Sequence, residues 1–241
     1  MKKFNLIFGF LATLSFASNG LADADMVRKS LAKALPGFVP DSIKPSEVPG
    51  LFEVAVGPKI YYMSEDGRYM LQGDHLVDIA ARTDITDKKE AKARVAVLEK
   101  LDQKDLITFA PKETRYKVSV FTDIDCGYCR KLHNEMDKYH AQGIAIQYLF
   151  FPRAGKGTES FKKAESVWCA DDRNQALTNA KNNDKVEPKT CDNPISEQMD
   201  LGVAMGARGT PMIVTQNGNV LPGYVPADKL AKVLQQESIK Q

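Results

Sequence analysis

The chain has 241 residues, of which 33 are Lys or Arg and 31 are Asp or Glu, so its formal net charge is +2. Loss of Lys2 and Lys3 with a leader brings this charge to zero, and a neutral chain of mixed charge gives no electrostatic reason to bind nucleic acid or an anionic membrane. The hydrophobic content of 43% suffices for packed cores, and the length favours one or two domains.

The N-terminus, residues 1–22, has the layout of a secretory signal peptide. A positive start is followed by an uncharged, mostly apolar run over residues 4–17, and Ala22-Asp23-Ala24 provides a cleavage signal after residue 22 or 24. A membrane anchor is the alternative, but the apolar run is shorter than the roughly 20 residues that a bilayer span needs. We therefore expect an exported mature chain that has no membrane anchor.

Residues 23–86 are predicted to form a small N-terminal domain. An amphipathic helix over residues 23–35 precedes a β-meander, in which residues 51–56 and 59–64 are strands and a turn at 65–68 leads into a third strand. So small a unit has a marginal core, and the edges of its sheet need cover. Pairing with a second copy meets both needs, so we expect a homodimer through this domain.

Residues 87–104 are rich in strong helix formers and contain no Gly or Pro. Their polar character, interrupted by a few apolar residues, favours a helical linker between two domains. The alternative is an ordinary surface helix of one larger domain.

Residues 105–241 are predicted to form a C-terminal domain in which strands alternate with helices, so the fold class is α+β or α/β. We expect a strand at 116–122, a helix at 126–140 and a strand at 144–151, and then a mostly helical insertion over residues 158–206. A strand at 212–215, a hairpin turn, a strand that ends near 224 and a helix after Pro226 complete the domain.

Cys126 and Cys129 lie where the strand at 116–122 passes into the first turn of a helix. Unpaired N–H groups and the helix dipole stabilise a thiolate there, so Cys126 is predicted to be a nucleophile. Asp123 and Asp125 would oppose this effect if their carboxylates lay close. Cys129, one turn later, is placed to attack a mixed disulfide on Cys126, and Gly127 and Tyr128 between the two cysteines tune both sulfurs.

Other uses of this cysteine pair fit the sequence less well. Covalent haem attachment requires a histidine directly after the second cysteine, and this chain has Arg130 there. His133 and His140 follow at a spacing that does not match a zinc finger, and a purely structural disulfide across so tight a loop gains little stability. A redox pair remains, and its chemistry requires neither a metal nor an organic cofactor.

The other two cysteines, Cys169 and Cys191, enclose a loop of about 23 residues, for which chain entropy gives about 3 kcal/mol of stabilisation. We interpret them as a structural disulfide, with a second redox pair as the alternative. Thr210-Pro211 heads an apolar strand, where a cis peptide bond would bring backbone next to another loop. A trans proline at the start of a strand is the commoner case.

The order of these motifs resembles the thioredoxin fold and, more closely, the DsbC-type family of periplasmic thiol:disulfide interchange proteins. The resemblance covers nearly all of the mature chain. The stretches that carry it are DGRYMLQG (66–73), VFTDIDCGYCRKLH (120–133), YLFFPRAG (148–155), WCADD (168–172), GTP (209–211) and NGNVLPGY (217–224).

The resemblance implies an N-terminal dimerisation domain, a linker helix and a thioredoxin-like catalytic domain. It assigns the attack to Cys126 and the partner thiol to Cys129, and it makes Thr210 and Pro211 the loop that faces them. It also implies a periplasmic isomerase that acts on misfolded, disulfide-containing exported proteins and is kept reduced by a membrane thiol reductase. The alternatives are a net disulfide oxidase or reductase, and a chaperone that needs no thiol.

Overall fold

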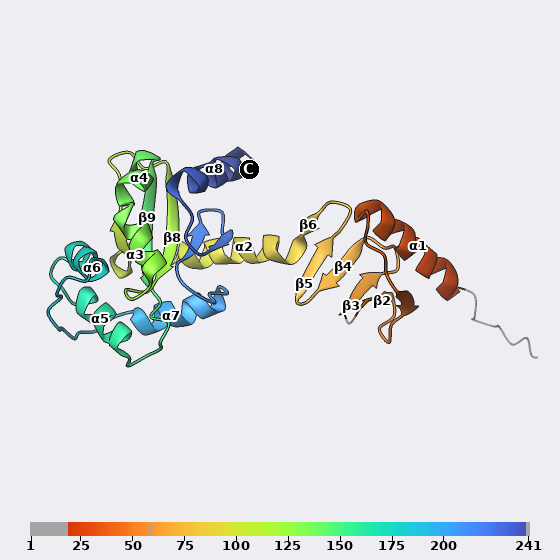
Figure 1. Ribbon diagram of the computed structural model, residues 1–241, viewed down its shortest axis with the longest axis horizontal. Coiled ribbons are helices and arrows are strands. Elements are labelled where there is room, and N and C mark those ends of the chain that lie inside the picture. Colours follow the sequence, from red (N-terminus) through yellow and green to blue (C-terminus); the bar gives the residue numbers. More distant parts are fainter. Residues whose placement is uncertain (1–18, 58, 240–241) are drawn as a thin grey trace, which may run out of the picture. The chain divides into compact units, whose positions relative to one another are not determined.

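The computed structural model describes residues 19–57 and 59–239. The predicted signal peptide lies outside these residues except for its last four, which belong to helix α1 (Asn19–Ala34). The chain divides into two compact units, with the boundary between Lys89 and Glu90 (Figure 1). None of the helices in the described ranges has both the length and the apolar character needed to cross a membrane.

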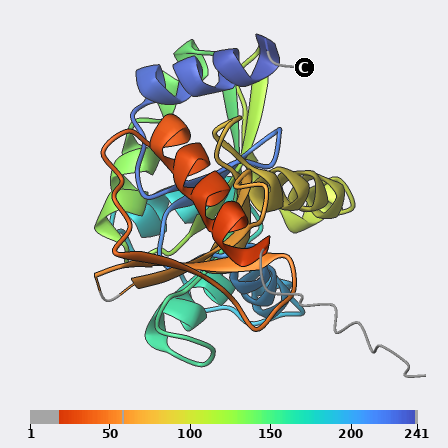
Figure 2. The same cartoon turned by 90° about the vertical axis from the view of Figure 1, so that its right-hand side faces the viewer.

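The N-terminal unit is one antiparallel sheet with α1 packed on one face (Figure 2). Strands follow one another in chain order: β1 (Ser42–Pro45), β2 (Leu51–Val56), β3 (Lys59–Ser64), β4 (Tyr69–Gln72), β5 (His75–Asp78) and β6 (Thr83–Asp84). Phe52 lies opposite Met63, and both belong to the same buried core cluster as Leu31 of α1. Since side chains alternate along a strand, Ile60 and Tyr62 point to the other face, where they are exposed.

Helix α2 (Ile85–Leu98) differs from the predicted linker at 87–104 because it ends six residues earlier. Asp102 caps a separate short 3₁₀ helix, η1 (Gln103–Asp105), by accepting a hydrogen bond from Lys104 N at 3.0 Å. One face of the second half of α2 is buried: Ala91 and Arg94 are covered, and Arg94 donates from Nε to Gly218 O at 2.7 Å. That half packs on the C-terminal unit.

The C-terminal unit contains a five-stranded sheet in the order β11-β10-β8-β9-β7. Only β8 and β9 are parallel, and both are buried on their two faces, which explains their nearly continuous apolar sequences. The strands are β7 (Ile107–Phe109), which the sequence did not predict, β8 (Tyr116–Thr122), β9 (Ile144–Phe150), β10 (Met212–Thr215) and β11 (Val220–Pro222).

Helices surround this sheet. The predicted helix at 126–140 is two helices that meet at Glu135, whose φ of −101° and ψ of 18° depart from helical geometry. Glu135 accepts hydrogen bonds from the Tyr224 hydroxyl and from Lys138. The helices are α3 (Gly127–Asn134), α4 (Met136–Ala141), α5 (Glu159–Trp168), α6 (Arg173–Lys181), α7 (Ile195–Ala204) and α8 (Ala227–Ile239), of which α5, α6 and α7 form the predicted helical insertion (Figure 1).

Candidate active site

Cys126 is the residue that caps the N-terminus of α3, four residues after the end of β8. Strand β10 pairs with β8, and Met212 lies opposite Phe121, so the loop before β10 reaches the same end of the sheet. The Thr210–Pro211 peptide bond in that loop is cis. Cys126 Sγ donates a hydrogen bond to Thr210 O at 3.2 Å, so the two motifs, 84 residues apart in the chain, form one site.

Opposing effects act on the Cys126 thiol. Burial raises its pKa, whereas the side chains of Thr210 and Cys129, which can donate to a thiolate, and the positive charge of Arg153 lower it, and the net shift of the pKa is downward. The hydroxyl of Thr210 is buried and has no hydrogen-bond partner among the described residues, so it is free to donate to a thiolate. The site therefore favours the reactive form of Cys126.

Cys129 is in a different environment. Its side chain is 1% exposed, and burial raises its pKa, although the charge of Lys181 acts in the opposite direction. Both thiols are free in this structure. Cys126 is thus the thiol more easily ionised, and Cys129 is a buried thiol one helical turn away.

The two acidic neighbours of Cys126 are both paired with cations. Asp123 is buried and accepts hydrogen bonds from Arg153 Nε at 2.9 Å and from Ser160 Oγ at 2.7 Å. Asp125 forms ion pairs with Lys163 at 2.8 Å and with Arg130 at 3.4 Å. These carboxylates were expected to oppose formation of the Cys126 thiolate. Because each of them faces a cation, that effect is offset.

The surface next to the cysteines is aromatic. Tyr128 is 64% exposed and stacks on Tyr224, with 6.4 Å between the ring centroids. Lys131 Nζ lies 4.7 Å from the centroid of the Tyr224 ring. A Cβ at Gly127 would meet nothing within 4 Å, so the backbone beside Cys126 has open space. These residues offer apolar and cationic contacts to a polypeptide at the site.

Lys181 is a residue of this site that sequence reasoning missed. It ends α6, is 1% exposed, and donates from Nζ to Thr122 Oγ1 at 2.7 Å and to Asp123 O at 2.9 Å. Burial lowers its pKa to about 8. One signal was available: Lys181 follows the buried Leu177 by four residues and therefore shares its apolar helix face.

The first histidine after the cysteine pair is held by two neighbouring hydroxyl groups. His133 is buried, with Nδ1 3.2 Å from the Tyr148 hydroxyl and Nε2 3.1 Å from Thr178 Oγ1. Burial and the charge of Lys181 lower its pKa to about 4, so its ring is neutral at physiological pH. No group of three or more potential metal ligands occurs within residues 19–57 and 59–239.

Cys169 and Cys191 form a disulfide, with 5.8 Å between their Cα atoms. It joins the end of α5 to the segment before α7, within the helical insertion. Trp168 is buried beside it, with the Arg173 guanidinium 3.8 Å from its ring centroid. This pair lies outside the environment described for Cys126 and Cys129.

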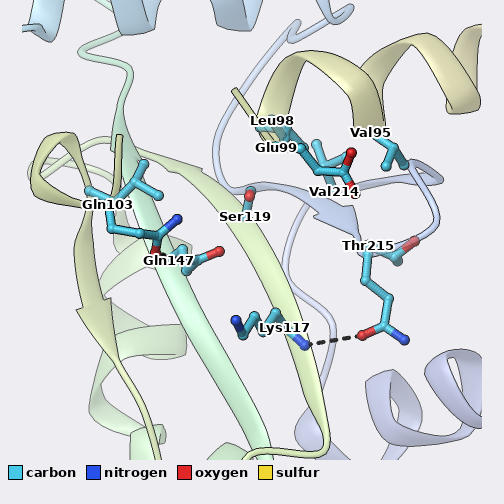
Figure 3. Close-up of a pocket in the computed structure, with 11 residues that line it drawn as sticks. Val95, Leu98, Glu99, Gln103, Lys117, Ser119, Gln147, Val214 and Thr215 are labelled. Atoms are coloured by element: carbon cyan, nitrogen blue, oxygen red, sulfur yellow. Dashed lines mark hydrogen bonds between the residues drawn. The ribbon is translucent and has the colours of Figure 1, made fainter. Parts of the chain in front are cut away.

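Two cavities bear on the position of the site. One of about 340 Å³ is lined by Leu98 of α2, by Lys117 and Ser119 of β8 and by Gln147 of β9, but by neither of the free cysteines (Figure 3). Another of about 500 Å³ opens directly beside the cysteine loop, where Ile124 contributes to its wall. Its lining also includes Asp125, the residue before Cys126.

Comparisons with known proteins agree with this arrangement. Residues 18–87 match the family model of the disulfide bond isomerase protein N-terminal domain, and residues 102–238 match that of a thioredoxin-like domain. The chain is 35% identical to thiol:disulfide interchange protein DsbC of Escherichia coli (strain K12) over 97% of this chain and 96% of that protein. It is 38% identical to DsbC of Salmonella typhimurium over 93% of this chain and 92% of that protein.

A solved structure shows the same fold. The disulfide interchange protein from Neisseria gonorrhoeae is 30% identical, with a TM-score of 0.51, and the match covers 56% of this chain and 97% of that one. The chain has an N-terminal domain of the disulfide isomerase type and a C-terminal thioredoxin-like domain, as its motifs predicted. It is a thiol-disulfide oxidoreductase that belongs to the DsbC family of thiol:disulfide interchange proteins.

Proposed function

We propose that this chain is a dimeric periplasmic isomerase that rearranges incorrect disulfides in exported proteins. The observation that carries the proposal is the position of Cys126, at the N-terminus of α3 and 3.2 Å from the carbonyl of Thr210. Its thiolate attacks one sulfur of a wrong disulfide, so the substrate S–S bond breaks and a mixed disulfide with Cys126 forms. The other substrate sulfur leaves as a thiolate.

Two outcomes follow from the mixed disulfide. If another substrate thiol attacks it, a new substrate disulfide forms and Cys126 is released reduced, with no net transfer of electrons. If Cys129 attacks it, the substrate is reduced by two electrons and the pair becomes a disulfide. The pair then needs an electron donor before it can act again, and a membrane thiol reductase fills that role in the proposal.

Recognition of the substrate requires an extended segment at the Thr210–Pro211 loop. In this proposal such a segment pairs with the backbone of that loop, much as a further strand adds to a sheet. Tyr128 and Tyr224 supply the adjacent apolar contact surface. This recognition depends on backbone and aromatic contacts, so it suits substrates of many sequences.

The N-terminal domain, residues 23–86, provides the dimer contact in this proposal. Its sheet has β1 and β6 as free edges, and its face opposite α1 exposes Ile60 to 51% and Tyr62 to 36%. Exposed strand edges and apolar side chains are features that a partner of the same kind covers. Residues 87–104 then act as the linker, and residues 105–241 as the catalytic domain.

The test is recovery of activity by a scrambled test protein with several disulfides, in a glutathione buffer. We expect the mature chain to restore activity and Cys126→Ala to abolish this restoration. Cys129→Ala should retain part of the rearrangement, because a substrate thiol can still release the mixed disulfide. Correction that survives Cys126→Ala would refute the mechanism, and suppression of aggregation alone would indicate a chaperone instead.

A further inference from the structure

The cavity of about 500 Å³ beside the cysteine loop has no part in the thiol chemistry described above. Its volume lies in the range of about 300–1,000 Å³ that is usual for binding pockets. Ile124 and Asp125 form one wall, and α5 and the loop after α6 form the others. The Cα of Asp125 is one peptide step, about 3.8 Å, from that of Cys126. A polypeptide joined to Cys126 by a disulfide therefore lies within a few residues of this cavity.

The uncharged part of the lining is largely apolar. Ile124 and Ala180, which are 2% and 8% exposed, contribute to it from the cysteine loop and from α6. Val186 and Pro188 contribute from the loop after α6, and Val186 also packs against the core of the C-terminal unit. Transfer of an apolar group from water to such a surface is favourable.

The charged part of the lining is balanced. Three lysines and three acidic residues contribute, so together they add no net charge: Lys162, Lys163, Lys185, Asp125, Glu159 and Asp184. Each of the three lysines is held in an ion pair, with Glu159 at 2.9 Å, Asp125 at 2.8 Å and Glu187 at 3.0 Å respectively. A charged group that enters has to compete with these pairs, whereas an apolar group contacts the lysine methylenes and leaves the pairs in place.

The Cys169–Cys191 disulfide holds the outer wall of the cavity. The loop that it closes contains α6 and the residues after α6 that line the cavity. Lys189 adds two further ties, because its N–H donates to Ser166 Oγ at 3.4 Å and its ammonium pairs with Asp171 at 3.2 Å. A wall that is fixed before a ligand arrives reduces the entropy lost on binding.

We propose that this cavity is a subsite for the substrate polypeptide, which binds a large apolar side chain, such as phenylalanine, close to the cysteine that joins Cys126. The inference rests on the function proposed above and adds a specificity to it. Large apolar side chains are mostly buried in native proteins and become accessible in misfolded ones. The subsite therefore favours disulfides whose surroundings have not folded.

The test uses short peptides made of Gly and Ser around one cysteine, which is joined by a disulfide to a coloured aromatic thiol. One peptide has no apolar residue, and each of the others has phenylalanine at one position near the cysteine, on either side. The Cys126 thiolate attacks the peptide sulfur, the S–S bond breaks and the aromatic thiolate leaves. Its release by the reduced mature protein is followed by stopped flow as a function of peptide concentration.

The variants change the lining at a half-buried position. Val186→Asp places a carboxylate in the apolar part, and Val186→Ile keeps that part apolar. Val203→Asp is the matched control, because Val203 is 65% exposed on α7 and does not line the cavity. The fluorescence of Trp168 reports whether each variant is folded.

We expect phenylalanine at one or more positions to speed release by the wild type about tenfold over the peptide that has none, through a lower half-saturating concentration. Val186→Asp should release the thiol from both peptides at nearly the same rate. Val186→Ile and Val203→Asp should keep the preference. The ratio between two peptides in one variant is the readout, because damage to the cysteine loop slows both of them alike.

Three results would overturn the inference: a wild type with no preference at any position, a preference that survives in Val186→Asp, or one that is lost equally in Val203→Asp. The second of these would assign the preference to the exposed surface of Tyr128 and Tyr224 instead. Equal release from every peptide would remove the subsite and leave the proposed thiol chemistry intact. No release from any peptide would refute the proposed function, and the subsite with it.

Discussion

Asp123→Asn is the substitution for which the structure gives the most detailed expectation. The carboxylate of Asp123 is 3% exposed. One oxygen accepts from Asp125 N at 2.9 Å and from Ser160 Oγ at 2.7 Å, and the other accepts from Arg153 N at 3.1 Å and Arg153 Nε at 2.9 Å. An amide replaces one of these two acceptors with a donor.

The loss of stability depends on which hydrogen-bond donors around residue 123 lose their acceptor. The amide nitrogen is best placed toward Ser160, whose hydroxyl can rotate and accept, but Asp125 N–H then has no acceptor. A buried donor without a partner costs about 1–3 kcal/mol. The Arg153 guanidinium also loses the negative charge that it faces, so we expect Asp123→Asn to lower the free energy of unfolding by about 3 kcal/mol.

The effect should depend on pH with a definite sign. Burial raises the pKa of Asp123, but hydrogen bonds from Ser160 and Arg153 outweigh it, and the folded-state pKa lies below the ordinary value. The carboxylate therefore stabilises the fold at pH values above its unfolded-state pKa, and this stabilisation is lost as the pH falls through the folded-state pKa. The difference between wild type and Asp123→Asn should shrink in acid.

The assay is urea unfolding followed by the fluorescence of Trp168, which is the only tryptophan and reports on the C-terminal unit. Asp125→Asn is the matched control. The Asp125 side chain is 33% exposed and its ion pairs involve half-exposed or partly exposed cations, so its loss should cost at most about 1 kcal/mol. Equal losses in the two variants, or a gap that persists in acid, would refute the reasoning.

Three further predictions concern other parts of the C-terminal unit. Joint replacement of Cys169 and Cys191 by Ala should cost about 3 kcal/mol in the same urea assay; unchanged stability would contradict this. Gly218→Ala should speed amide exchange in α2, because a Cβ would lie 1.9 Å from a carbonyl oxygen of that helix, whereas Gly209→Ala, with nothing within 4 Å, should not. Alkylation of Cys126 should have a pH midpoint below that of an ordinary thiol, since its pKa is lowered, and a higher midpoint would count against the site as described.

Local patterns predicted most of the elements that hold the cysteine pair. Strand β8 is predicted by a run of β-branched residues, and the start of α3 by an abrupt change in the period of the apolar residues. Both signals are visible within about ten residues of sequence. Position 98 shows where such reasoning ends. Helix-forming residues continue to Leu101, but the helix ends at Leu98 and Asp102 caps a separate short turn.

The surroundings of the thiols were harder to predict because they depend on contacts between distant segments. Lys181 is buried where α6 packs against α3, and the two helices are separated in the chain by α4, β9 and α5. Glu135 divides the predicted helix where the hydroxyl of Tyr224, 89 residues later, meets its carboxylate. Neither partner is visible in a window of neighbouring residues, so only the folded chain reveals them.

The positions of the two cysteines have a consequence for oxidative damage. Cys126 is 3% exposed and lies next to the open backbone at Gly127, while Cys129 is 1% exposed behind it. A peroxide therefore meets Cys126 first and converts it to a sulfenic acid. Cys129 condenses with that acid to give the internal disulfide and water, before a second oxidation can make the change irreversible. The product of this oxidation is the same internal disulfide that arises in the proposed function, so the electron donor proposed there would also reverse this damage.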